Sequence, residues 1–266
     1  MHYYEHIWSL SRSNMLADER HAKILHEINT HGSITTAQLI ETFDVSPITI
    51  RRDLTELDAL GLIAKVHGGA RSVRATHNPT YTQKSQTNQQ AKQEIARAAA
   101  RHVKDGDSVG FAAGSTCAAV AAEVADCSNL TIITNSIRVA DQFQAAPHTD
   151  LFVTGGKRTP SEALVGPLTL SALSNLHFDT LFTSTHGATA EVGLTSPSVE
   201  EAAAVRALID SAHRVIQVFD HSKWGFNALS TFAQWSDIDL VIVDSQTPAS
   251  VISQLEDLVE KVEVAQ

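Results

Sequence analysis

Two adjacent arginines, Arg51 and Arg52, could bind the phosphates or base edges of DNA, because a guanidinium group presents several hydrogen-bond donors in one plane. They lie in a stretch whose apolar residues recur at helical spacing on one face. The opposite face carries Ile48, Arg52 and Thr55, and Thr49 and Arg51 flank it. A helix with this front is equipped to sit in a major groove. The alternative is a surface helix with a solvated arginine pair.

The neighbouring residues predict where this helix begins and ends. Ser46 is a favourable N-cap, and Pro47 follows at the first helical position, where its missing N–H costs nothing. Val45 and Ile50 can pack together across the start as a hydrophobic staple. Gly61 follows the last turn as a stop signal. The expected buried face consists of Ile50, Leu54 and Leu57.

Two helices precede this segment, and their connection predicts a helix-turn-helix. We expect the first over residues 18–30, and the second over residues 35–43 with a capping box at Thr35 and Gln38. A tight turn then leads into the arginine-bearing helix. The expected buried residues are Ala22, Leu25 and Ile28 in the first helix and Ala37, Ile40 and Phe43 in the second.

A predicted hairpin completes a winged helix. Residues 62–66 and 70–73 have strand patterns and are joined by a glycine-rich turn that includes His67, which can serve as a turn residue or as a contact. Asp53 is expected to orient an arginine or cap a neighbour, because phosphate repels a carboxylate. This context favours DNA binding over a solvated helix. The expected DNA-binding residues are Ser46, Ile48, Thr49, Arg51, Arg52, Lys65, His67 and Arg71.

Length and charge limit the possible functions. The chain has 266 residues, which is too long for a lone DNA-binding module and favours two domains. With 43% hydrophobic and 19% charged residues, it can bury a sizeable core. The net charge of −10 argues against non-specific nucleoid binding over the whole surface. A local basic patch remains, formed by Arg51, Arg52, Lys65, Arg71 and Arg74.

The two cysteines and the hydropathy indicate a cytoplasmic protein. If Cys117 and Cys127 lie on one helix, a rise of 1.5 Å per residue places them about 15 Å apart, too far for a disulfide. We therefore expect reduced thiols. No apolar run approaches the roughly 20 residues of a membrane span, and the first residues lack a signal-peptide pattern.

The second half of the chain predicts an α/β domain. Nearly wholly apolar strands alternate with helices, which implies a doubly wound, mostly parallel sheet covered on both faces. The expected domains are a flexible extension at 1–17, a winged helix-turn-helix at 18–75, a polar linker at 76–91 and an effector-binding domain at 92–266. The predicted strands span residues 108–112, 130–134, 151–154, 180–184, 215–219 and 240–243, and the predicted helices span residues 92–101, 116–125 and 136–144.

Small, polar and glycine residues follow nearly every predicted strand, at the edge of the sheet where ligands bind in such folds. Gly114, Ser115 and Thr116 lead straight into a helix, whose free N–H groups and hydroxyls could cradle a phosphate, although such a turn also serves as a simple N-cap. A single ligand pocket explains these residues together. The other candidates are Asn135, Gly155, Gly156, His186, Gly187, Asp220, His221 and Lys223.

Both halves resemble the DeoR family of bacterial transcription regulators. The first half carries IRRDL at 50–54, Leu57, Gly61-Leu62 and VHGGA at 66–70. The second half resembles that family's effector domain, which is similar in fold to ribose-5-phosphate isomerase, glucosamine-6-phosphate deaminase and the CoA transferases. The resemblance covers about residues 20–244. The matching pieces of the second half are the GST loop at 114–116, TNS at 134–136, GG at 155–156, LVGP at 164–167, EEAA at 200–203 and DHSKWG at 220–225.

The resemblance implies operator DNA and a phosphorylated sugar or polyol as partners. The GST loop would hold the phosphate and Lys223 would supply positive charge, which suits a compact anion. Asn135, Asp220 and His221 would meet sugar hydroxyls, although His221 could equally orient a strand end. Reading inverted half-sites requires at least a dimer, so a homo-oligomer is expected. No cofactor and no metal site are expected.

Three departures from the family pattern surround the expected pocket. Residues 112–116 read AAGST where the family usually has Asp-Ser-Gly-Thr-Thr, so a carboxylate is missing. Residues 183–186 read TSTH where Gly-Ala is common, and Val205 replaces a lysine. Family members usually carry an arginine near Lys84 and an asparagine at Asn88. The departures indicate a non-standard ligand or a weakened response, with His186 as part of a new specificity.

The sequence therefore predicts a transcription regulator, a repressor of carbohydrate or polyol metabolism genes, and no enzymatic activity. The alternative is a sugar-phosphate isomerase or deaminase fused to a DNA-binding domain. Such an enzyme needs a general acid and a general base around an open-chain sugar. Asp220, His186 and His221 are available, but the missing loop carboxylate leaves no convincing pair.

Overall fold

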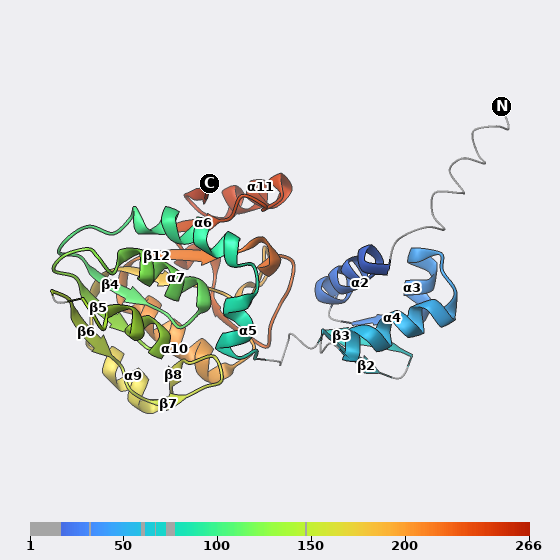
Figure 1. Ribbon diagram of the computed structural model, residues 1–266, viewed down its shortest axis with the longest axis horizontal. Coiled ribbons are helices and arrows are strands. Elements are labelled where there is room, and N and C mark those ends of the chain that lie inside the picture. The colour runs from blue at the N-terminus through green and yellow to red at the C-terminus, as the bar shows by residue number, and fades with distance from the viewer. Residues whose placement is uncertain (1–16, 32, 60–61, 67, 73–77, 147) are drawn as a thin grey trace. The chain divides into compact units, whose positions relative to one another are not determined.

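The computed structural model describes residues 17–31, 33–59, 62–66, 68–72, 78–146 and 148–266 (Figure 1). The chain divides into two compact units, one comprising residues 1–77 and 225–227 and the other residues 78–224 and 228–266. The expected extension at 1–17 lies outside the described residues apart from Ala17. None of the helices in these ranges has the length and apolarity needed to cross a bilayer.

The C-terminal unit is built on a seven-stranded sheet in which every neighbouring pair is parallel. Six of its strands are those predicted from the apolar runs, and the edge strand β15 was not predicted. In sheet order the strands are β15 (Val262–Val264), β14 (Leu240–Val243), β12 (Ala212–Phe219), β9 (Phe178–Thr183), β4 (Ser108–Phe111), β5 (Thr131–Thr134) and β6 (Asp150–Val153).

Helices cover both faces of this sheet, which confirms the doubly wound α/β class (Figure 1). The core on one face includes side chains of α6 and α7, and the core on the other includes those of α10 and α11. The expected helix at 136–144 is a short α8 followed by a 3₁₀ turn, η1. The bounds are α6 (Gln89–Ala100), α7 (Ser115–Val124), α8 (Ile137–Ala140), η1 (Asp141–Phe143), α9 (Pro167–Leu173), α10 (Val199–Asp210) and α11 (Ala249–Leu258).

Smaller elements were not predicted from the sequence. A three-stranded antiparallel sheet has the order β10-β11-β13, and β7 and β8 form a two-stranded ladder. Each of these strands has at most four residues, and none forms a nearly wholly apolar run of the kind that predicted the strands of the main sheet. Their bounds, with two further 3₁₀ turns, are β7 (Lys157–Arg158), β8 (Leu164–Val165), β10 (Gly187–Thr189), β11 (Gly193–Ser196), η2 (His221–Lys223), β13 (Ser230–Ala233) and η3 (Trp235–Asp237).

The segment expected to be a linker at 76–91 contains regular structure. Helix α5 (Tyr81–Gln86) opens with a capping box between Thr80 and Gln83, and α6 begins at Gln89. The cysteine expectation also needs correction, because Cys117 lies in α7 whereas Cys127 lies beyond its end. Both thiols are free.

The N-terminal unit is a winged helix-turn-helix, as predicted. Three helices pack with an antiparallel sheet of order β1-β3-β2, in which β1 was not foreseen. The predicted capping box forms, because Thr35 Oγ1 accepts from the Gln38 N–H and the Thr35 N–H donates to Gln38 Oε1. The elements are α2 (Ala17–His31), β1 (Ser33–Thr35), α3 (Thr36–Phe43), α4 (Pro47–Ala59), β2 (Ile63–Val66) and β3 (Gly69–Ser72).

The core of this unit corrects two expected positions. Ala22 and Ala37 are exposed, and the larger Ile24 and Leu39 are fully buried instead. Burying a large aliphatic side chain removes more apolar surface from water than burying an alanine, so the helices turn those residues inward. The predicted face of α4 is confirmed, with Ile50, Leu54 and Leu57 all buried.

A buried ion pair fastens α4 to α2. Asp53 is 3% exposed and accepts from Arg20 Nε at 2.6 Å and Arg20 Nη2 at 2.9 Å, and His21 Nε2 lies 3.1 Å from its Oδ1. Asp53 therefore orients an arginine, but one on α2. Burial alone would raise the pKa of Asp53, yet the hydrogen bonds from Arg20 and His21 hold it below its usual value.

We predict that Asp53→Ala destabilises the N-terminal unit by about 3 kcal/mol at pH 7, because it leaves the Arg20 guanidinium buried without its counter-charge. A carboxyl group whose pKa is lower in the folded than in the unfolded chain stabilises the fold when the pH is above the unfolded-state pKa. That stabilisation is lost as the pH falls through the folded-state pKa. The difference between wild type and variant should therefore shrink below about pH 4. Hydrogen exchange of the α4 amides in the full chain measures this difference in stability.

Glu19→Ala is the matched control, because it breaks an exposed pair on α2 in which Lys23 Nζ lies 2.9 Å from Glu19 Oε1. Its expected cost is under about 1 kcal/mol. Equal effects of the two substitutions at pH 7 would contradict the role given to Asp53.

Candidate functional site

The N-terminal unit presents the exposed front of α4. Ile48 is 78% exposed, the side chain of Arg52 is 80% exposed, and Arg51 is also exposed. Ser46 caps the helix, because its Oγ accepts from the Thr49 N–H at 3.1 Å, and the two hydroxyl oxygens lie 2.9 Å apart. Ser46 and Thr49 therefore order the start of the helix, while the isoleucine and the arginines face outward.

The hairpin is joined to α4 by polar contacts. Lys65 Nζ donates to Thr55 Oγ1 at 2.7 Å, and the Lys65 N–H donates to Asp58 Oδ1 at 2.8 Å. Lys65 thus lies beside the front of α4. Arg71 pairs with Ala64 across the β2-β3 ladder, and His67 lies outside the described residues.

In the C-terminal unit, the GST loop follows β4 and begins α7. A Cβ on Gly114 would lie 2.2 Å from Ser184 Oγ, so a larger residue here would have to displace the side chain that follows β9. No side chain caps α7 at Gly114, which leaves the first N–H groups of the helix for another acceptor. Ser115 is half-buried and Thr116 is buried. The loop can therefore receive an anion at Ser115 and its neighbouring backbone.

Asn135 holds this loop in place through both ends of its side-chain amide. Its Oδ1 accepts from the Ala113 N–H at 3.0 Å, and its Nδ2 donates to the Leu164 carbonyl at 3.1 Å. The side chain is 1% exposed. Asn135 therefore holds the strand ends together, and these bonds engage both ends of the amide that was expected to meet sugar hydroxyls.

Gly155 and Gly156 shape a turn that packs against α9. Both have positive φ, of 71° and 123°, and the Gly155 carbonyl accepts from Thr169 Oγ1 at 2.7 Å. A Cβ on Gly156 would lie 2.3 Å from that Oγ1 and 2.6 Å from the Val165 carbonyl oxygen. The positive φ angles and the close approach at Gly156 explain why this turn requires glycine.

His186 and Gly187 connect β9 to the small sheet. The His186 N–H donates to the Thr195 carbonyl at 3.1 Å. The Gly187 carbonyl accepts from Thr185 Oγ1 at 2.7 Å and Thr195 Oγ1 at 2.8 Å. Gly187 is buried and His186 is half-buried, so only the histidine is positioned to reach a ligand.

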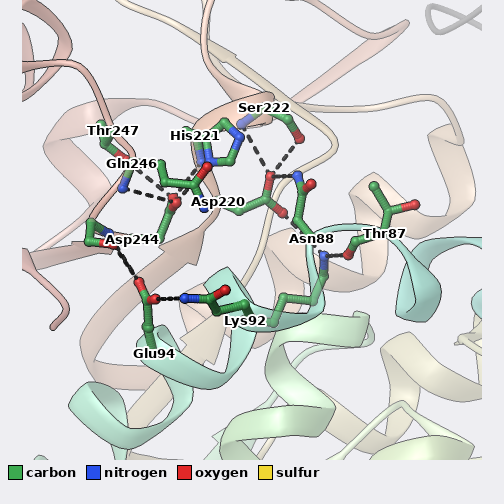
Figure 2. Close-up of polar contacts among 12 residues, drawn as sticks. Thr87, Asn88, Lys92, Glu94, Asp220, His221, Ser222, Asp244, Gln246 and Thr247 are labelled. Atoms are coloured by element: carbon green, nitrogen blue, oxygen red, sulfur yellow. Dashed lines mark hydrogen bonds and ion pairs between the residues drawn. The ribbon is translucent and has the colours of Figure 1, made fainter.

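Asp220 is the centre of the network in Figure 2. It is fully buried at the end of β12 and accepts from Asn88 Nδ2 at 2.7 Å and from Ser222 Oγ at 2.5 Å, and Lys92 Nζ lies 3.3 Å away. Burial would raise its pKa, but the charges of Lys223 and Lys92 and these hydrogen bonds hold it far below its usual value. Asp220 therefore stays ionised and binds the start of α6.

A second buried carboxylate, Asp244, holds His221. His221 Nδ1 lies 2.7 Å from Asp244 Oδ2, and the His221 N–H donates to Asp244 Oδ1 at 2.7 Å (Figure 2). The histidine side chain keeps 29% exposure while Asp244 has none. The pair fixes the ring orientation at the ends of β12 and β14.

Lys84 of α5 lies in the same region; from the sequence, a role for it in coupling the two domains was only a guess, based on the arginine that family members usually carry near this position. Its Nζ donates to Asn78 Oδ1 at 2.9 Å, and Asn78 Nδ2 donates to Glu201 Oε1 at 2.8 Å. Burial lowers the pKa of Lys84 to about 8, the negative charge of Glu201 opposes this, and the positive charge of Lys223 adds to it. Two ammonium groups from distant parts of the chain, those of Lys84 and Lys223, therefore repel one another.

We call Asn78, Lys84, Glu201, Asp220 and His221 the strand-end cluster. Helix α5, which carries Lys84, also packs against α7, the helix that the GST loop begins. Glu201 also accepts from Thr159 Oγ1 at 2.6 Å and from Ser161 Oγ, which fixes the start of α10. The sequence did offer one signal for this arrangement. The Thr80 and Gln83 spacing is that of a capping box, and it marks a helix in the stretch that lacks apolar periodicity.

Comparisons with known proteins assign both units. Residues 20–76 match a family model described as the DeoR-like helix-turn-helix domain, and residues 87–245 match the DeoR C terminal sensor domain. The glycerol-3-phosphate regulon repressor of Escherichia coli (strain K12) is 32% identical over 244 residues, which cover 91% of this chain and 97% of that protein. The transcriptional regulator GolR of Listeria innocua is 32% identical over 254 residues, covering 95% and 100%.

Two further comparisons differ in how much they support the family assignment. The transcriptional regulator GlpR of Haloferax volcanii is 34% identical over 244 residues, covering 91% of this chain and 95% of that protein. Ribose 5-phosphate isomerase A from Methanocaldococcus jannaschii has 18% identity and a TM-score of 0.39, over 52% of this chain and 55% of that one. A structural likeness this low carries no argument. The two family models and the nearly full-length relatives show that the chain belongs to the DeoR family of transcription regulators.

Proposed function

We propose that the protein is a transcriptional repressor whose affinity for operator DNA is controlled by a phosphorylated sugar or polyol. The observation that carries the effector proposal is the convergence of Lys84 and Lys223, which lie 139 positions apart in the chain (223 − 84). Each cation makes the other less favourable, because like charges repel. A bound phosphate would relieve that repulsion.

The surroundings of the two lysines support an anion rather than a neutral ligand. The GST loop leaves the first N–H groups of α7 uncapped by any side chain, and α7 packs beside α5. Backbone N–H groups at a helix start and ammonium groups are complementary to phosphate. The Escherichia coli relative is named for the glycerol-3-phosphate regulon, which adds a small phosphorylated polyol to the candidates.

The segment 78–92 offers a route from effector to DNA. It follows the DNA-binding unit directly in sequence. The Asn78–Glu201 hydrogen bond holds it to the start of α10, and the Asn88–Asp220 hydrogen bond holds it to the end of β12. Because Lys84 lies within it, a phosphate that draws in Lys84 acts on this segment. A ligand shifts such an equilibrium only by its difference in affinity for the two states, commonly about 1–3 kcal/mol.

On the DNA side, we propose that Ile48, Arg51 and Arg52 meet the major groove, with Lys65 at the backbone. The exposure of these α4 residues supports this role. An arginine can contact guanine with two hydrogen bonds, and an isoleucine can contact a thymine methyl group. A homodimer or larger assembly follows if the operator has inverted half-sites.

We propose no catalytic activity. Asp220 would be a candidate general base for an isomerase or deaminase, but it is fully buried and already accepts from Asn88 and Ser222. A general base must reach the proton that it removes. The curated relatives compared above are named as transcriptional regulators or repressors.

Arg52→Ala should lower affinity for the DNA upstream of the protein's own gene by about 1–3 kcal/mol, roughly 5- to 150-fold, through loss of a base or phosphate contact. Fluorescence anisotropy with that DNA measures the effect. Lys23→Ala on α2 is the control, because it also removes an exposed cation and should leave the affinity within twofold. Wild-type affinity in Arg52→Ala would contradict the placement of α4 in the groove.

Binding of ribose 5-phosphate should weaken by up to about tenfold between pH 7 and pH 9. Lys84, with a pKa of about 8, loses its charge over that range, whereas the phosphate is already a dianion. Lys84→Arg keeps its charge and should bind equally at both pH values. Calorimetric titration measures this, with the exposed Lys104→Arg as control. An unchanged pH dependence in Lys84→Arg would exclude Lys84 from the phosphate site.

A further inference from the structure

Two polar side chains are buried side by side in the seven-stranded sheet. Thr183 is the last residue of β9, and Gln217 of β12 is its partner in the parallel ladder. Both residues have 0% exposure. They lie on the face that α10 covers, because they alternate with Phe182 and Val218, whose side chains belong to the core of the opposite face.

These side chains have hydrogen-bonding groups that the described protein residues leave unsatisfied. The hydroxyl of Thr183 and both the amide nitrogen and the amide oxygen of Gln217 have no partner among them. Burying one such group without a hydrogen bond costs about 1–3 kcal/mol. Three orphan atoms on adjacent strands indicate that a group from outside the chain supplies their partner.

The position of this pair connects it to the strand-end cluster. Thr183 directly precedes Ser184, the residue that a Cβ on Gly114 would meet. Gln217 lies on β12, three residues before Asp220, which follows the end of that strand (220 − 217). Helix α10, which carries Glu201 beside Lys84, also packs on β9 and β12. A ligand whose phosphate lies at the lysines could therefore extend toward the pair.

The chemistry of the pair selects an uncharged oxygen. A threonine hydroxyl and a glutamine amide each donate and accept hydrogen bonds, and neither carries charge. The surrounding buried cluster is apolar and includes Val205 and Ala202 of α10 and Val241 of β14. A carboxylate or ammonium group would be buried there without a counter-charge, which is costly. A hydroxyl or carbonyl oxygen matches the site.

We propose that Thr183 and Gln217 bind the hydroxyl or carbonyl oxygens of the effector and so select phosphorylated polyols and neutral sugars over phosphorylated acids and amines. This rests on the proposed effector site. Because both side chains are fully buried, the ligand reaches them only when the covering elements move. Occupancy would then favour a conformation other than the one described, as a sensor requires.

The test is a thermal-unfolding assay on the full chain with four probes: glycerol 3-phosphate, ribose 5-phosphate, 3-phosphoglycerate and inorganic phosphate. The wild type should be stabilised more by the first two than by 3-phosphoglycerate. Thr183→Val and Gln217→Leu should unfold at the wild-type temperature or above without ligand, because they remove unpaired groups. Each variant should lose more than half of the thermal shift caused by glycerol 3-phosphate and ribose 5-phosphate. Each should keep the response to inorganic phosphate.

Thr131→Val, at the opposite end of the sheet, is the matched control and should keep every shift. If Thr183→Val and Gln217→Leu keep the wild-type thermal shifts and unfold at lower temperatures without ligand, the pair is a structural water site. That outcome would overturn this proposal and leave the proposed effector site standing. Lys84→Ala should lose the response to all four probes. If the wild type responds to none of them, the effector site itself is wrong and both proposals fail.

Discussion

A buried carboxylate needs compensation from its surroundings, and Asp220 obtains it from segments far apart in the chain. Asn88 and Lys92 come from the segment that follows the DNA-binding unit, whereas Ser222 and Lys223 follow β12. The ionised Asp220 therefore fixes where the segment 78–92 meets the edge of the sheet. The location of Lys84 depends on this attachment, and the proposed phosphate site depends on Lys84.

The same constraint acts in the N-terminal unit. Asp53 lies on the buried face of α4 and is compensated by Arg20 and His21 of α2. Because Asp53 follows Arg52 directly, its side chain is turned inward where its neighbour faces out. In each unit a buried ion pair holds one functional segment, α4 or residues 78–92, in one orientation.

Periodicity and motif spacing predicted the fold well where elements are long and regular. The α4 helix, its Ser46 cap and six of the seven parallel strands followed from apolar spacing. The candidate site was harder to predict, because it depends on side-chain partners. Asn135 and Asp220 have residue types that suit sugar hydroxyls, yet both make buried internal bonds. Thr183 and Gln217 look like ordinary strand residues until their unpaired atoms are seen in three dimensions.

The proposed function requires that effector binding at the strand-end cluster and DNA binding by α4 be thermodynamically coupled. The most direct measurement is a linkage cycle with glycerol 3-phosphate and upstream DNA, in which each affinity is measured with and without saturation by the other ligand. If the two sites are coupled, both affinities should fall by the same factor, roughly 5- to 150-fold, since coupling free energy is reciprocal. Stabilisation of the protein by the phosphorylated compound with no change in DNA affinity would contradict it.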